Sequence, residues 1–283
     1  MRIGVTPSAA TRAAALRLAD LAVAGGLDTL WLGDGYLDNP DFPMWAGGLE
    51  NLTHLAWMAG RYPAARVGSS AAVLPLRDPA WMAKQAATID QLTEGRFVLV
   101  VAPGFWPREA EHRGVDFATR GLRFAEHLDA MLAGLRGEAF AGPTVMIPEW
   151  GRLSPEPFTA GGPPVWLAGG DATMRRALAR SLPFQASRRT PEQLLPIAAT
   201  FHEAGGTFLA LRVRLQFGDA PTAGHGVDWH AVSGSVAELV DAIGSYKAMG
   251  VQDLSIIPGQ DDAVSLRTVE VLVEDVLPQL GAS

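Results

Sequence analysis

The sequence of 283 residues contains no cysteine, which excludes disulfide bonds, thiolate metal sites and cysteine nucleophiles. It also lacks any run approaching the roughly 20 apolar residues of a membrane span, so no membrane is expected as a partner. No basic cluster stands out and the formal net charge is −7, so nucleic acid is not an expected partner either. A strand-like run begins at once with no signal peptide before it, and we therefore expect a cytoplasmic location.

Two common catalytic patterns are missing as well. No pair of histidines or carboxylates has the spacing of metal ligands, and no Gly-x-Ser-x-Gly turn is present. No metal site is therefore predicted, and hydrolysis by zinc or by a serine nucleophile is disfavoured. A site without these groups suits a cofactor that carries the reaction itself.

What the sequence does contain is a regular alternation of short apolar runs with longer amphipathic segments. The composition, 48% hydrophobic and 19% charged, is that of an ordinary globular protein. The apolar runs predict strands at residues 3–6, 29–33, 66–72, 97–102, 165–168, 184–186, 208–215 and 254–257. The amphipathic segments predict helices near residues 9–25, 50–60, 79–93, 119–135, 172–181, 191–204, 235–249 and 262–279.

This alternation predicts an α/β fold with a parallel sheet covered by helices. Eight strand–helix units favour a (β/α)8 TIM barrel, and an open doubly wound sheet is the alternative. We expect a single domain over residues 1–283. The stretch 137–164, rich in proline and glycine, is interpreted as an insertion between helix 4 and strand 5, and residues 218–234 as a long loop.

In such a barrel the site lies at the carboxyl ends of the strands. Glycine and small residues there let a ligand approach the backbone closely, although they also simply end strands. Gly169 and Gly170 precede a helix whose free N–H groups suit an anion, while Asp171 also fits as a plain N-cap. Asp34 ends the second strand, where its carboxylate can bind a ligand or cap the next segment.

Candidates for proton transfer are few. They are Tyr36 after the second strand, His54 in a helix and His230 in the long loop. Four aromatic side chains near strand ends suggest a pocket for an apolar or planar substrate, with ordinary packing as the alternative. These four are Tyr36, Trp45, Phe105 and Trp106.

Several stretches resemble one known family. "VLPLRDPAWMAKQAATIDQLTEGRFVLVVAPGFW" (Val73–Trp106) is similar to the signature of the bacterial luciferase-like oxidoreductases, which use flavin or deazaflavin. "GVDFATRGLRF" (Gly114–Phe124), "DTLWLGD" (Asp28–Asp34), "PVWLAGG" (Pro164–Gly170) and "VLPQL" (Val276–Leu280) resemble the same family. The matches run through nearly the whole chain in barrel order.

The resemblance implies a TIM barrel that binds either coenzyme F420 or FMN, and a homodimer packed through the helices after strands 2 and 3. It implies a non-prolyl cis peptide at Ser70-Ala71 that supports the ring of the cofactor. It places the ring near the turn after strand 4 and the phosphate-bearing tail near the turn after strand 5. With Asp34, the resulting cofactor set is Ser70, Ala71, Ala102, Pro103, Gly104, Ala168, Gly169 and Gly170.

The chain departs from the family at two points. Many deazaflavin members have Asp-His after strand 2, but here Gly35 follows Asp34. Some have a catalytic glutamate after the strand-4 glycine, where this chain has Phe105. The acid–base mechanism of those relatives is therefore not carried over.

Three functions remain open from the sequence. The leading hypothesis is F420-dependent hydride transfer to or from a small organic or natural-product substrate, such as reduction of a C=C or C=N bond. The second is an FMN-dependent monooxygenase that uses reduced flavin and O2 in a dry aromatic pocket. The third is a non-catalytic barrel that binds flavin.

Overall fold

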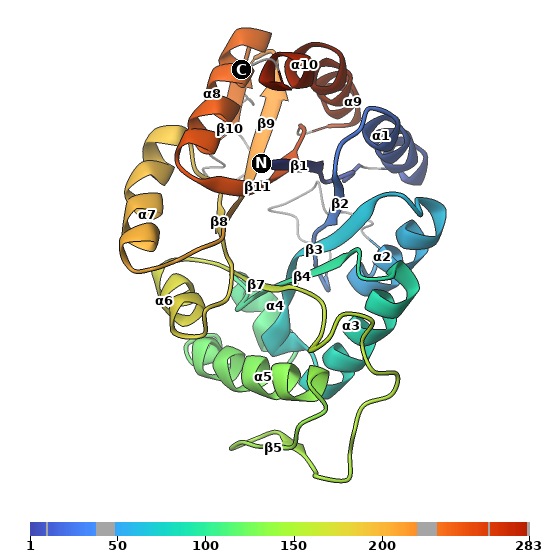
Figure 1. Ribbon diagram of the computed structural model, residues 1–283, viewed down its shortest axis with the longest axis vertical. Coiled ribbons are helices and arrows are strands. Elements are labelled where there is room, and N and C mark those ends of the chain that lie inside the picture. Colours follow the sequence, from blue (N-terminus) through green and yellow to red (C-terminus); the bar gives the residue numbers. More distant parts are fainter. Residues whose placement is uncertain (10, 38–48, 220–230, 260, 282–283) are drawn as a thin grey trace.

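The computed structural model describes residues 1–9, 11–37, 49–219, 231–259 and 261–281, which form a barrel of parallel strands surrounded by helices (Figure 1). The barrel strands are β1 (Arg2–Val5), β2 (Thr29–Leu32), β3 (Arg66–Val73), β4 (Phe97–Ala102), β7 (Val165–Ala168), β8 (Phe184–Ser187), β9 (Leu209–Phe217) and β11 (Val251–Ile257). They lie in the order β11-β1-β2-β3-β4-β7-β8-β9, and pairing of β9 with both β8 and β11 closes the ring. The predicted TIM barrel is confirmed, because an open sheet would have left two edges.

The covering helices follow the strands as predicted. They are α1 (Arg12–Ala24), α2 (Asn51–Arg61), α3 (Pro79–Thr93), α5 (Arg120–Leu135), α6 (Asp171–Ala179), α7 (Pro191–Glu203), α8 (Val236–Ala248) and α9 (Asp262–Val271). A π-helical turn (Leu272–Val276) joins α9 to α10 (Leu277–Gly281), where one unbroken helix was expected. Within the described residues, none of the helices combines the length and the apolar character needed to cross a membrane.

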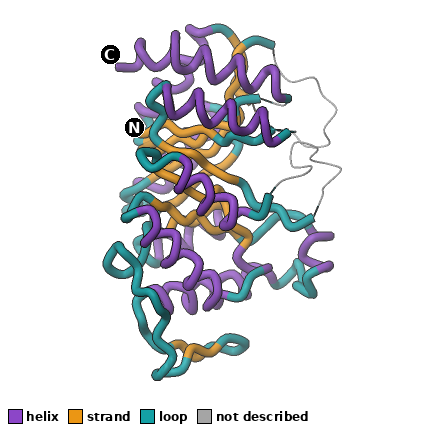
Figure 2. Tube along the Cα trace, turned by 90° about the vertical axis from the view of Figure 1, so that its right-hand side faces the viewer, coloured by secondary structure: helices purple, strands orange, loops and turns teal. Residues whose placement is uncertain are grey.

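Four short elements were not predicted. They are α4 (Pro107–His112), the antiparallel pair β5 (Phe140–Ala141) and β6 (Met146–Ile147), and β10 (Ala231–Gly234), which pairs in parallel with the last residues of β9. The β5–β6 hairpin falls in the stretch interpreted as an insertion, and it projects from one end of the molecule (Figures 1 and 2). Figure 2 also shows both termini on the same side of the molecule.

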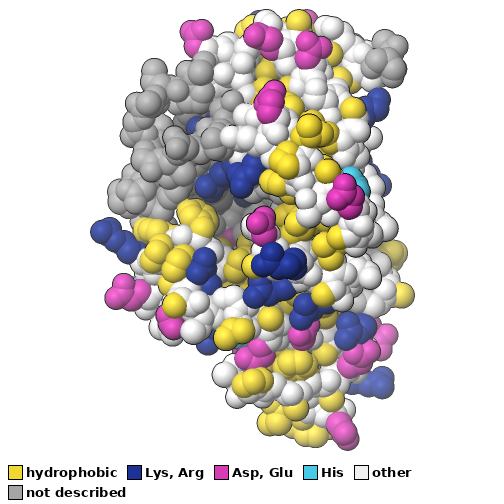
Figure 3. Space-filling view, turned by 90° about the vertical axis from the view of Figure 1, so that its left-hand side faces the viewer, with side chains coloured by type: hydrophobic (Ala, Val, Ile, Leu, Met, Phe, Trp, Pro, Cys, Tyr) yellow, Lys and Arg dark blue, Asp and Glu magenta, His cyan; other side chains and the backbone are white. Residues whose placement is uncertain are grey.

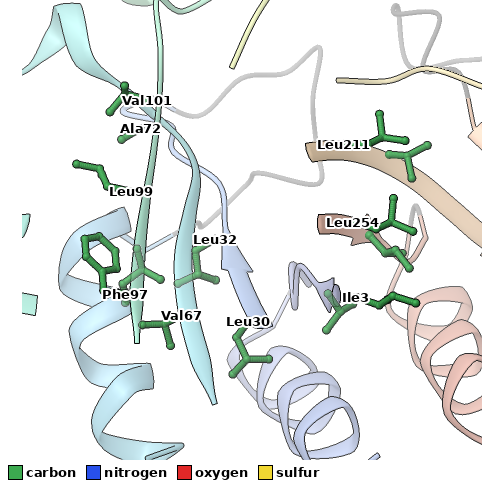
Figure 4. Close-up of a cluster of buried hydrophobic side chains, with 14 of the residues drawn as sticks. Ile3, Leu30, Leu32, Val67, Ala72, Phe97, Leu99, Val101, Leu211 and Leu254 are labelled. Carbon is green, nitrogen blue, oxygen red and sulfur yellow. The ribbon is translucent and has the colours of Figure 1, made fainter. Parts of the chain in front are cut away.

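Apolar side chains form two separate layers. The larger layer lies between the barrel and its helices, and Figure 4 shows part of it, including Leu30, Val67 and Leu99. The smaller layer fills the barrel interior around Trp31 and Trp166, whose ring centroids are 5.5 Å apart. Alternation along each strand separates the two layers, because successive side chains point to opposite faces.

The half of the barrel interior at the amino ends of the strands is filled with side chains. Arg66, the first residue of β3, lies with its guanidinium 5.5 Å from the Trp31 ring centroid and forms an ion pair with buried Asp253. Gly4 and Gly68 make room for Trp31, since a Cβ at Gly68 would come within 2.3 Å of its ring. Bulky side chains thus fill the barrel interior at the amino ends of the strands, on the side opposite their carboxyl ends.

Candidate active site

The carboxyl end of β3 contains an irregularity that the resemblance predicted. The Ser70-Ala71 peptide is cis, and the pairing of β3 with β4 shifts register between Ser69 and Ala72. Ser70 is fully buried, and its Oγ donates a hydrogen bond of 2.9 Å to Oε1 of Gln185 on β8. This bond crosses the barrel interior, because three strand-to-strand steps separate β3 from β8 along the sheet.

Small side chains line the mouth of the barrel, which is its open end at the carboxyl ends of the strands. They come from three neighbouring strands. Ala71, Ala102 and Ala168 belong to the interior layer at the upper ends of β3, β4 and β7. Gly104 follows β4 with φ +80°, and a Cβ there would lie 2.8 Å from Val73 Cγ1. Its carbonyl accepts a 3.1 Å hydrogen bond from Arg120 Nε, which fixes the Pro103-Gly104 turn. We call Ser70, Ala71, Ala102, Pro103, Gly104, Ala168 and Gly169 the small-residue wall.

The turn after β7 leads directly into α6. Gly170 is the N-cap of this helix and Asp171 its first residue, so the alternative in which Asp171 caps the helix is wrong. A side chain at Gly169 would collide with Thr173, at 2.5 Å from its Oγ1, whereas a Cβ at Gly170 would meet no heavy atom within 4 Å. The backbone of this turn is therefore accessible next to a helix N-terminus.

Asp34 is held by its protein neighbours. Its Oδ2 accepts a hydrogen bond of 2.9 Å from the Val73 N–H, and its Oδ1 pairs with Arg77 at 2.7 Å. Arg77 also pairs with Glu50, just before α2. The carboxylate thus ties the end of β2 to the end of β3 and to Arg77, which precedes α3, rather than capping the segment that follows it.

The proton-transfer candidates are spread out. Tyr36 is 55% exposed, with its ring centroid 5.7 Å from that of His112. His54 lies on α2 outside the barrel, 6.0 Å from Trp57 between ring centroids, and burial lowers its pKa. His230 and the pocket candidate Trp45 lie outside the described residues.

A buried carboxyl group beside Tyr36 was not predicted. Glu109 of α4 accepts a 2.6 Å hydrogen bond from the Tyr36 N–H, and burial, aided by the charge of Asp34, raises its pKa. With Asp34, Tyr36 and Arg77 it lines a cavity of about 260 Å³. Sequence patterns gave no signal for it, because α4 is too short to show a helical period.

The aromatic candidates after β4 differ in exposure. Phe105 is 54% exposed, and the guanidinium of Arg188 lies 5.0 Å from its ring centroid. Trp106 is half-buried and directly precedes α4. This contact places the turn after β4 next to Arg188, the residue that follows β8.

Three arginines, one directly after β8 and two within β9, were also not predicted as site residues. Arg188 follows β8, and Arg212 and Arg214 occupy alternate positions of β9. The run "LRVRLQF" gave the one available signal, a pair of charges inside an otherwise apolar strand. Lys and Arg side chains also gather near the middle of the face that Figure 3 shows.

This arrangement can hold a flat ligand against the small-residue wall with basic groups nearby. Among the residues that the structure describes, no group of three or more His, Cys, Asp or Glu is placed to hold a metal ion.

Comparison with known proteins gives a consistent picture. A family model described as luciferase-like monooxygenase matches residues 1–204. The 4-hydroxyprotoasukamycin monooxygenase of Streptomyces nodosus subsp. asukaensis is 29% identical over 161 residues, which are 53% of this chain and 40% of that protein. The chain spans less than half the length of the first curated relatives it matches.

Three solved structures share the fold over nearly the whole chain. A monooxygenase from Streptomyces bottropensis is 18% identical, with a TM-score of 0.81 and 99% of both chains covered. The oxygenating constituent of 3,6-diketocamphane monooxygenase from Pseudomonas putida, in complex with FMN, is 17% identical, with a TM-score of 0.76 over 99% of this chain and 98% of that one. The F420-dependent tetrahydromethanopterin reductase of Methanopyrus kandleri is 13% identical, also with a TM-score of 0.76, over 99% of both chains. At these identities the likeness establishes the fold and leaves the cofactor open.

Proposed function

Because the chain belongs to the luciferase-like monooxygenase family, we propose that it uses reduced FMN and O2 to oxygenate a small organic substrate. The small-residue wall carries this proposal, since three neighbouring strands end in side chains small enough for a tricyclic ring to lie against them. The description of the matching family and the name of the Streptomyces nodosus relative, a monooxygenase, support oxygenation.

The residues at the mouth fit the ring of a flavin. Gln185 is buried, and its Nε2 has no hydrogen-bond partner among the described residues, while its Oε1 is held by Ser70. A buried amide N–H without a hydrogen-bond partner costs free energy of folding. A hydrogen bond to a ligand would recover that cost. Gln185 would therefore orient the ring, with Ser70 as the residue that fixes the amide.

The turn after β7 fits the phosphate of FMN. Gly170 leaves space where a side chain would stand, and the N–H groups at the start of α6 have the partial positive charge that suits an anion. Reduced FMN would supply the electrons for the reaction with O2. The chain would hold the ring, exclude water from the mouth and position the substrate.

Hydride transfer with F420 is the second candidate, and the position of Phe105 favours it. The exposed ring of Phe105 occupies the position at which some relatives have a catalytic acid. Hydride transfer needs chiefly that the substrate carbon lie against the hydride-carrying cofactor. Glu109 on α4 is a buried carboxyl group, and its raised pKa suits a proton donor for either chemistry.

A homodimer is also proposed, packed through α2 and α3. Trp81 and Leu92 lie eleven residues apart on α3, hence on one face of that helix, and are 67% and 64% exposed. Trp57 on neighbouring α2 is 40% exposed. Large apolar side chains gathered on adjacent helices are typical of a protein interface.

The proposed function is tested by turnover with each cofactor. The purified protein is supplied with a substrate panel and with reduced FMN or reduced F420, in the presence and in the absence of O2. The reactions with O2 use isotope-labelled O2, and the products are analysed for the label. Labelled oxygen in a product formed only with reduced FMN supports the proposal. Oxygen-independent turnover with F420 would replace it by the second candidate, and turnover with neither would favour a non-catalytic flavin-binding barrel.

A further inference from the structure

The part of the small-residue wall that belongs to β3 is held in place by a serine directly before it. We propose that Ser69 is a positioning residue for the cofactor ring, because its hydroxyl ties β3 to β4 where the backbone of β3 is irregular. Ser69 would thereby fix Ser70 and Ala71, the two wall residues that follow it. The inference rests on the proposed function, since it concerns the ring that this wall would hold.

β3 has one residue more than β4 over the stretch where their pairing shifts. Ser69 pairs with Leu99, and Ala72 pairs with Val101. Two residues of β3 therefore lie between these pairs, whereas β4 has only Val100 there. An extra residue of this kind is a β-bulge, which interrupts the regular ladder between two strands and redirects the side chains of the longer one.

The bulge turns two consecutive side chains toward the barrel interior. Ala71 packs against the interior layer and is half-buried. Ser70 donates to Gln185, which faces the interior because its neighbours Phe184 and Ala186 belong to the layer between the barrel and its helices. Regular alternation would place only one of two successive residues on this side. The bulge thus creates the part of the wall on which a ring would lie.

Ser69 clamps β3 to β4 directly before the bulge. Its Oγ donates a hydrogen bond of 2.7 Å to the Val100 carbonyl and accepts one of 3.0 Å from the Val100 N–H. The Leu99 N–H bonds the Pro164 carbonyl on the β7 side, so the backbone groups of Val100, one residue further along, point toward β3. The hydroxyl therefore acts as donor and as acceptor toward the one residue of β4 that lies opposite the bulge.

Ser69 itself does not belong to the surface of the mouth. It is fully buried. Val67 belongs to the layer between the barrel and its helices, and a Cβ at Gly68 would meet the interior ring of Trp31. Alternation therefore starts the side chain of Ser69 from the same outer face as that of Val67. It can act on a ring only through the two residues that follow it, which is the role of a positioning residue.

The far end of the bulge is anchored as well. The Val73 N–H donates a hydrogen bond of 2.9 Å to Asp34. Ala71, between the two anchors, has no polar side-chain atom, so the backbone on either side determines its place. A gap of about 0.5–1 Å already forfeits a quarter to a half of the attraction between two packed atoms. Loss of the Ser69 anchor should therefore weaken the packing of a ring without removing any atom that touches it.

The test compares two fully buried hydroxyl groups that both bond the backbone. Ser69→Ala removes the first, and Thr93→Val removes the second as the matched control. Thr93 is the last residue of α3, and its Oγ1 donates to the Ile89 carbonyl at 2.7 Å. It stands four residues before β4 begins, at the end of the barrel opposite the mouth.

Fluorescence titration measures the affinity of each protein for FMN and for riboflavin. In Ser69→Ala both affinities should fall by about tenfold or more and by the same factor, because the two ligands share the ring. The visible circular dichroism of bound FMN should change as well. Thr93→Val should leave the affinities and the spectrum unchanged, although urea unfolding should show both variants to be less stable than wild type. Ser69→Cys, which has nearly the same shape but a weaker donor and acceptor, should lie between wild type and Ser69→Ala.

Three results would overturn the inference. The first is a Ser69→Ala protein that is less stable but binds both flavins as wild type does, which would make the hydroxyl purely structural. The second is a loss of affinity for FMN but not for riboflavin, which would place the effect at the phosphate. The third is an equal loss of affinity in Thr93→Val, which would trace it to general destabilisation. Should Ser69→Ala not fold, Ser69→Cys is judged by the same three results.

These outcomes are separate from the fate of the proposed function. Binding needs no turnover, so products without labelled oxygen would remove the proposed function and leave the inference about Ser69 standing. If the wild-type protein binds F420 in place of FMN, the same variants are titrated with F420. An unchanged affinity in Ser69→Ala then overturns the inference in the same way.

Discussion

Single residues determine the shape of the mouth. Alanine and glycine at the ends of β3, β4 and β7 leave space on one wall, and arginines on β9 fill the wall opposite. Between them the Ser70–Gln185 hydrogen bond crosses the interior. The two walls thus differ in the size and the charge of their side chains.

Gly170 tests where the phosphate of the cofactor lies. We expect Gly170→Leu to weaken FMN binding by about tenfold or more, because its side chain would occupy the free space before α6. Affinity for riboflavin, which has no phosphate, should change little, and fluorescence titration measures both. Unchanged FMN affinity in a folded variant would refute this placement.

Asp253 should make stability depend on pH in an unusual direction. Burial, only partly opposed by Arg66, raises its pKa from 3.8 to about 6 in the folded state. The folded protein then binds more protons than the unfolded chain between about pH 4 and pH 6, so this residue's contribution to stability is lost as pH rises through that window.

The difference between wild type and Asp253→Asn isolates this contribution. Urea unfolding is measured for both proteins from pH 4 to pH 7. The free energy of unfolding of wild type, relative to the variant, should fall with increasing pH and level off above about pH 6. A relative stability that rises over this range would show that Arg66 outweighs burial and that the folded-state pKa is lowered.

At the scale of elements, boundary signals in the sequence were reliable. Asp78 and Thr190 directly precede two of the expected helices and Ser235 opens a third, and all three are N-caps; α7 and α8 each begin with a reciprocal capping box. The strands were also predictable, since all-apolar runs between turn residues are typical of a parallel sheet. Short elements were missed, because six residues in α4 and two in each strand of the hairpin are too few to show a period.

The cap of α7 provides a test at this scale. Thr190→Ala removes the oxygen that accepts from the Gln193 N–H and should lower the free energy of unfolding by about 1 kcal/mol. Thr200→Ala in the same helix is the control, because that exposed hydroxyl donates to the Pro196 carbonyl one turn back and caps neither end of the helix. Equal losses in the two variants would show that the cap contributes nothing specific.

At the scale of the whole molecule, the order of strands decides which residues meet. The sequence placed cofactor candidates at strand ends, and the closed ring brings those of β3, β4 and β7 together. It did not show that Arg212 and Arg214 face the interior, because both faces of a barrel strand are buried and the hydrophobic pattern does not distinguish them. The side of the barrel on which a residue lies became clear only from the packing of its neighbours.

Assembly is tested on the exposed tryptophans. If α2 and α3 form the dimer interface, Trp81→Glu should shift the protein from dimer to monomer in light scattering coupled to gel filtration. Trp150→Glu is the control, since Trp150 is 88% exposed in the stretch between β6 and β7 and belongs to neither helix. A dimer that persists in Trp81→Glu, or dissociates in Trp150→Glu, would contradict this interface.

The central claim is that the mouth of this barrel is built for reduced FMN. Anaerobic titration of the wild-type protein with reduced FMN and with reduced F420, followed by fluorescence, tests it most directly. The account predicts one saturable site with at least about tenfold higher affinity for reduced FMN. Tighter binding of F420, or no saturable binding of FMN, would contradict it.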